Sequence, residues 1–87
     1  MYITRIDITE MPPAQPGQPW RGLVALFSGG DCVRLHCSAR TADRAARRAR
    51  FVEDALRQLR RMPEFRRGAR HIALAPGLRP RAAPAGA

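Results

Sequence analysis

The sequence contains no lysine, few aromatic residues and no long apolar run. All 16 basic residues are arginine, and seven acidic residues leave a net charge of +9 over 87 residues. No apolar stretch approaches the ~20 residues that a membrane-spanning helix needs, and the first residues lack the apolar core of a signal peptide. We therefore expect a cytoplasmic protein without a membrane span, and the excess of arginine favours an anionic partner.

Residue types that carry chemistry are also scarce. Cys32 and Cys37 are separated by an odd number of positions, so a strand would point them to opposite faces and prevent a bond between them. Neither these cysteines nor His36 and His71 lie at a metal-binding spacing or beside an acid that could orient an imidazole. The sequence has no Gly-x-Ser-x-Gly elbow and no phosphate loop. We predict no catalytic residue, no metal site, no cofactor and no enzymatic activity.

The first part of the chain has the pattern of three strands. Residues 2–9 alternate well enough to predict a strand, and the proline-rich residues 11–19 predict an extended loop. Residues 20–27 are mostly apolar on both faces, which is typical of a central strand. The glycine pair in residues 28–31 then predicts a tight hairpin turn into a returning strand at 32–38.

A long helix follows. Thr41 is the predicted N-terminal cap, and Pro63 is expected to end the helix near Met62. Apolar residues recur with the helical period at Ala45, Ala49, Val52, Ala55, Leu56, Leu59 and Met62. We predict that Val52, Leu56 and Leu59 bury against Val33, Leu35 and the strand at 20–27.

These elements predict an α+β fold. We expect a three- to four-stranded antiparallel sheet in β-β-β-α-β order, with one long amphipathic helix packed on one face. Residues 72–74 supply the weak last strand, so residues 1–75 form the predicted single domain. Residues 76–87 are rich in proline, alanine, glycine and arginine, and we predict a disordered basic tail.

The arginines concentrate in the second half of the chain. Residues 41–87 hold twelve arginines against four acids, whereas residues 1–40 hold four against three. Asp43–Arg47 and Glu53–Arg57 lie at i,i+4 and are expected to form ion pairs that offset only part of this charge. Guanidinium groups match phosphate oxygens well, so the sequence favours sequence-independent contact with nucleic acid or another polyanion. The candidate residues are Arg47, Arg48, Arg50, Arg57 and Arg61 on the helix, with Arg66 and Arg67 beyond Pro63.

A second hypothesis remains open. One helix can cover only one face of the sheet, so the strand at 20–27 should expose either Leu23, Ala25 and Phe27 or Trp20, Val24 and Leu26. Exposed apolar patches and unpaired strand edges are common interfaces. The protein would then be a homodimer, through the second sheet face or a strand edge, or the small subunit of a larger assembly.

Overall fold

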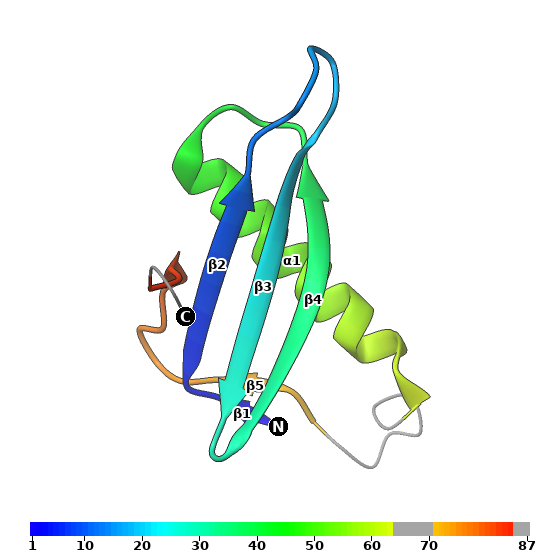
Figure 1. The fold of residues 1–87 in the computed structure, drawn as a ribbon. Coiled ribbons are helices and arrows are strands. Elements are labelled where there is room, and N and C mark those ends of the chain that lie inside the picture. Colours follow the sequence, from blue (N-terminus) through cyan, green and yellow to red (C-terminus); the bar gives the residue numbers. More distant parts are fainter. Residues whose placement is uncertain (64–70, 85–87) are drawn as a thin grey trace.

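The computed structural model describes residues 1–63 and 71–84 and contains one helix behind a narrow sheet (Figure 1). The elements in chain order are β1 (Tyr2–Ile3), β2 (Arg5–Met11), β3 (Trp20–Ser28), β4 (Asp31–Ala39), α1 (Arg44–Arg61), β5 (Ala73–Leu74) and β6 (Arg81–Ala82). The main sheet has the order β4-β3-β2-β6, and β1 pairs separately with β5. The predicted α+β class is confirmed, but the main sheet is mixed because β6 runs parallel to β2.

The central meander of β2, β3 and β4 follows the predicted strands. Val24 in β3 lies between Ile8 of β2 and Leu35 of β4, which fixes the register of all three strands. Ser28 pairs with Asp31, so Gly29 and Gly30 alone form the hairpin turn. Gly29 has a φ of 59°, a conformation that glycine adopts at little cost.

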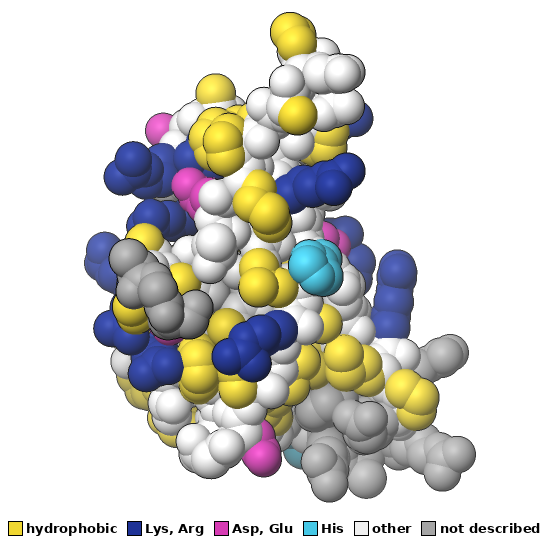
Figure 2. All heavy atoms as spheres, viewed as in Figure 1, with side chains coloured by type: hydrophobic (Ala, Val, Ile, Leu, Met, Phe, Trp, Pro, Cys, Tyr) yellow, Lys and Arg dark blue, Asp and Glu magenta, His cyan; other side chains and the backbone are white. Residues whose placement is uncertain are grey.

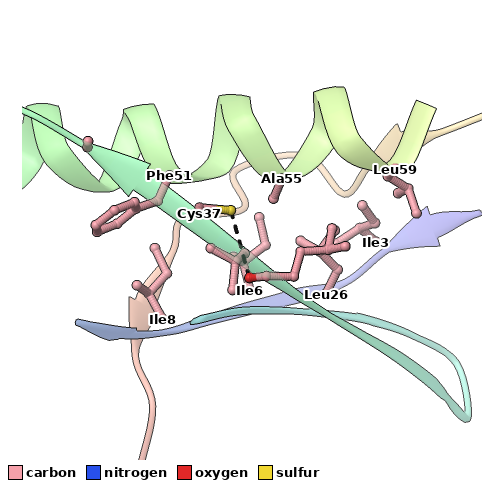
Figure 3. Packing of buried hydrophobic residues seen from close by; sticks show 11 residues of the cluster. Ile3, Ile6, Ile8, Leu26, Cys37, Phe51, Ala55 and Leu59 are labelled. Carbon is pink, nitrogen blue, oxygen red and sulfur yellow. Dashed lines mark hydrogen bonds between the residues drawn. The ribbon is translucent and has the colours of Figure 1, made fainter. Parts of the chain in front are cut away.

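The core lies between α1 and the sheet, but the buried face of the helix differs from the predicted one. Phe51, Ala55 and Leu59 are fully buried and point from the helix toward the sheet (Figure 3). Val52 and Leu56 are only partly buried. The helix is therefore rotated by about one position relative to the predicted stripe. Leu59 is the member of the predicted trio that reaches the centre of the core.

Gly22 explains how the rotated helix fits. A Cβ atom at this position of β3 would lie 3.0 Å from two carbons of the Phe51 ring. The absent side chain of Gly22 therefore leaves the space that the Phe51 ring occupies. Phe51, which the apolar stripe places at its margin, is the largest fully buried side chain.

The predicted N-terminal strand is broken at Thr4. The Thr4 amide donates to the carbonyl of Phe27, and the break turns Ile3 into the core. Ile3 and Tyr2 form β1, which pairs in parallel with β5. The predicted strand at 72–74 thus exists in part, but it lies beside β1 and not in the main sheet.

Residues 76–84 differ from the predicted disordered tail. Leu78 packs against the core, and β6 extends the sheet beside β2. The Arg81 Nε donates to Asp7 Oδ1 at 2.8 Å, and the Ala83 amide donates to the Ile8 carbonyl at 2.9 Å. A short parallel pairing needs few backbone donors, so the prolines of this segment do not prevent it. Residues 85–87 lie outside the described part of the chain.

Candidate nucleic-acid interface

The structure removes Arg47 from the predicted interface. Its side chain is buried, and it donates from Nη2 and Nε to the two carboxylate oxygens of Glu10 at 3.0 and 3.3 Å. Its Nη1 donates to the Ala42 carbonyl at 2.8 Å, and its guanidinium lies 3.7 Å from the centroid of the Trp20 ring. The predicted Asp43–Arg47 pair is wrong, since Asp43 caps the helix by accepting from the Ala46 amide.

Arg48 is also partly occupied. Its Nε lies 3.8 Å from Glu10 Oε1, so Glu10 faces two of the predicted interface arginines. The alternation of β2 contained a signal for this partner: Ile6 and Ile8 face the core, and the same period places Glu10 on that face beneath the start of α1. The predicted strand ended at residue 9, so Glu10 was not expected to face the helix.

Three predicted arginines share one exposed flank of α1. Arg50, Arg57 and Arg61 recur at intervals of seven and four residues, which places them on one side of a helix. All three are exposed, and we call them the arginine flank. Arg66 and Arg67, predicted to extend it, lie outside the described residues.

Acidic neighbours offset the flank only weakly. Arg50 lies 3.8 Å from Glu53, and Arg57 lies 3.9 Å from Asp54, instead of the predicted Glu53–Arg57 pair. Both contacts are long, and both arginine side chains are more than half exposed. Such exposed pairs contribute between about 0 and 1 kcal/mol, so an anionic ligand could compete for either guanidinium.

A groove of about 570 Å³ lies between the arginine flank and the end of β4. Arg40 enters it from the segment that joins β4 to α1, and its Nη1 donates to the Gly17 carbonyl at 3.0 Å. Guanidinium groups therefore line the groove from both the helix and the connecting segment. The full lining is Pro19, Ser38, Ala39, Arg40, Thr41, Arg50, Glu53, Asp54 and Arg57.

Two helix side chains cover part of the outer edge of β4. The Gln58 Nε2 donates to the His36 carbonyl at 2.7 Å, and the Ser38 amide donates to Asp54 at 3.4 Å. These are backbone groups that an added strand would use for pairing. The hypothesis of a homodimer through a strand edge is therefore disfavoured along this part of β4.

Cys37 lies behind this protected edge and should be unreactive. Burial, followed by the charge of Asp54, raises the pKa of the Cys37 thiol to about 12. The thiol stays protonated near neutral pH, and the thiolate is the reactive form. At about pH 8 we expect iodoacetamide to modify the half-buried Cys32 and spare Cys37, and to modify both in denaturant, as peptide mass mapping would show. Equal rates at the two sites in the folded protein would contradict this environment for Cys37.

The geometry of the described residues offers neither a metal site nor a membrane-spanning helix. Among residues 1–63 and 71–84, no group of three His, Cys, Asp or Glu side chains could hold a metal ion. No helix in that same part of the chain has the length and apolar character that crossing a bilayer requires.

No protein-family model, curated protein or solved structure matches this chain, so no relative supplies a function for its arginines.

Proposed function

We propose that the protein is a small module that binds the backbone of nucleic acids without reading their sequence. The observation that carries this proposal is the arginine flank beside Arg40. Within the protein, Arg50 and Arg57 make only long, exposed ion pairs, which a phosphate group could replace. Arg40, Arg50 and Arg57 line the same groove, whereas Arg61 lies outside it. Arg47 is no longer among the candidate residues, because its guanidinium is bound to Glu10 inside the protein.

The spacing of the flank suits a regular row of phosphates. The helix rise places Arg50 about 10 Å from Arg57 along the axis and Arg57 about 6 Å from Arg61. Over that combined length, duplex DNA presents roughly five phosphates per strand. Arg50 and Arg57 make only long, exposed ion pairs with Glu53 and Asp54, so their contacts should position a backbone and carry no sequence information.

The proposal predicts a salt-dependent interaction. Changing Arg50 and Arg57 together to alanine should weaken binding to both duplex and single strands. It should also flatten the plot of log affinity against log salt concentration by about two units, one for each lost phosphate contact. Fluorescence anisotropy with labelled oligonucleotides between ~50 and ~200 mM salt measures both effects.

A charge-matched variant provides the control. Arg44 and Arg79 are exposed and lie outside the groove, so changing both to alanine removes the same charge. This control should keep most of the wild-type slope. Equal loss in the two variants would show that net charge, and not the arginine flank, drives binding. Absence of any binding at ~50 mM salt would overturn the proposal.

A further inference from the structure

On the face of the sheet opposite α1, Leu23 and Phe27 are partly exposed, whereas Ala25 between them is only 9% exposed. Strand alternation sends Val24 and Leu26 into the core, so Leu23, Ala25 and Phe27 form a column along β3 on the other face. This settles which of the two predicted sets lies away from the helix. Figure 2 views this face and shows apolar side chains along its middle, with arginine and histidine around them.

The border of this face is strongly basic. Cross-strand pairing places Arg5 beside Phe27, Arg34 beside Ala25 and His36 beside Leu23, all on the same face. Arg21 and Arg81 add two more guanidinium groups. We call Leu23, Ala25 and Phe27 with this arginine border the open face.

Acid on the open face is already engaged. Asp7 lies beside Ala25 but is only 5% exposed. Its carboxylate accepts from Arg81 at 2.8 Å and lies 3.5 Å from the Nε of Arg5. Among the described residues, four arginines on this face are thus offset by one aspartate that is turned away from solvent.

The positive charge of the open face favours some binding partners over others. A second copy packed face to face would bring two arginine borders together, and like charges placed opposite one another oppose association. A duplex would present phosphates but keep its bases stacked inside. A single strand presents both phosphates and apolar base faces, which matches an apolar column with a basic border.

We propose that the open face binds single-stranded nucleic acid, with bases over the apolar column and phosphates at the arginine border. The proposal rests on the backbone-binding function and adds a preference for single strands on a second surface. Its anchor is the stacked pair of Arg5 and Phe27, in which the guanidinium lies 3.8 Å from the ring centroid. Half of the Arg5 side chain is exposed, so a base can stack on the outer face of the guanidinium.

The column has the spacing that splayed bases require. Alternate residues of a strand lie about 6.6 Å apart, roughly twice the 3.4 Å separation of stacked bases. Phe27 and Leu23 lie two such steps apart. Bases over these two partly exposed side chains would therefore be unstacked from one another, and each would gain a contact with the protein in exchange. Unpaired strands accept this arrangement more readily than duplexes.

The test compares one conservative variant on two ligands. Phe27→Leu keeps an apolar side chain of similar size but removes the aromatic ring under Arg5. With labelled oligonucleotides of about 12 nucleotides, we expect wild-type protein to bind the single strand more tightly than the matching duplex. Phe27→Leu should reduce single-strand affinity about tenfold and leave duplex affinity unchanged.

A second substitution and a competitor complete the test. Leu23→Thr should also weaken only single-strand binding, and circular dichroism confirms that both variants are folded. Equal affinity of wild-type protein for the two ligands, or equal effects of Phe27→Leu on both, would overturn the proposal. Competition by polyglutamate as effective as that by single-stranded DNA would overturn it in favour of an acidic protein partner. A dimer that Leu23→Thr dissociates would overturn it in favour of a second copy.

The two functional proposals fail separately. The Arg50/Arg57 variant tests the arginine flank and should weaken binding of both ligands. If the wild-type protein binds single strands and duplexes equally, but the Arg50/Arg57 variant binds both more weakly, only the open-face proposal would be overturned. If Phe27→Leu weakens single-strand binding but the Arg50/Arg57 variant binds like wild type, only the proposal for the arginine flank would be overturned.

Discussion

Replacing Phe51 with alanine should lower the free energy of unfolding by about 3–5 kcal/mol. The ring is fully buried between α1 and β3, and it lies against the space left by Gly22. Neither the helix backbone nor the sheet can close a cavity of that size without moving the other core residues. Urea denaturation followed by circular dichroism measures the change.

A matched variant makes this test specific to the observed helix face. Leu56, which the sequence predicts as a core residue, is only partly buried, so Leu56→Ala should cost less than Phe51→Ala. The reverse order would support the predicted helix face over the observed one. Gly22→Ala probes the same contact from the sheet and should cost about 1–3 kcal/mol, because its new methyl group must displace the ring.

Replacing Arg47 with methionine should also be strongly destabilising, by about 3 kcal/mol. The substitution keeps the apolar length of the side chain but leaves the Glu10 carboxylate without its bidentate donor. It also leaves the Ala42 carbonyl without its side-chain partner and removes the cation from the Trp20 ring. Glu10 is 18% exposed, so water can solvate its carboxylate in part. The loss in free energy of unfolding should therefore lie at the lower end of the range for a broken buried ion pair.

The double variant separates the unpaired carboxylate from lost packing. Adding Glu10→Gln to Arg47→Met removes the uncompensated charge and should restore part of the stability in thermal or urea unfolding. The Arg47→Met protein, measured while folded, should keep the wild-type salt dependence of nucleic-acid binding. A flattened salt slope would instead return Arg47 to the interface that the sequence predicted.

Local sequence signals predicted most elements of the fold. The two glycines after Ser28 identified the hairpin turn, and Pro63 marked the end of α1. Alternation along β3 showed that both of its faces are apolar. It could not say which face meets the helix, because that choice depends on contacts with residues distant in sequence.

The helix face was predicted less well because a periodic pattern considers only the polarity of each helix residue and not its contacts with other elements. Arg47 shares the buried side of α1 with Phe51, yet its charge excludes it from any apolar stripe. Only its distant partners, Glu10 and Trp20, make burial of that charge favourable. The same applies to Gly22, whose role depends on a ring from another element.

In the candidate interface too, features set by the helix alone could be predicted, whereas features that depend on tertiary contacts could not. The predicted exposed stripe of the helix comprised Arg47, Arg50, Arg57 and Arg61. The last three do share an exposed flank, whereas Arg47 is buried. Arg40 was not among the predicted residues, because the groove that it enters exists only after β4 and α1 have packed together. The open face likewise required the strand pairing that places Arg5, Arg34 and His36 beside the β3 column.

The pairing of β6 with β2 has a consequence for biosynthesis. The ion pair between Asp7 and Arg81 spans a sequence separation of 74 residues, whereas the meander and α1 need only nearer contacts. A ribosome that releases the chain from its N-terminus would let β2, β3, β4 and α1 assemble first, with the outer edge of β2 still unpaired. An unpaired edge of this kind can pair with another chain, and the arrival of residues 81–83 covers it at Asp7 and Ile8.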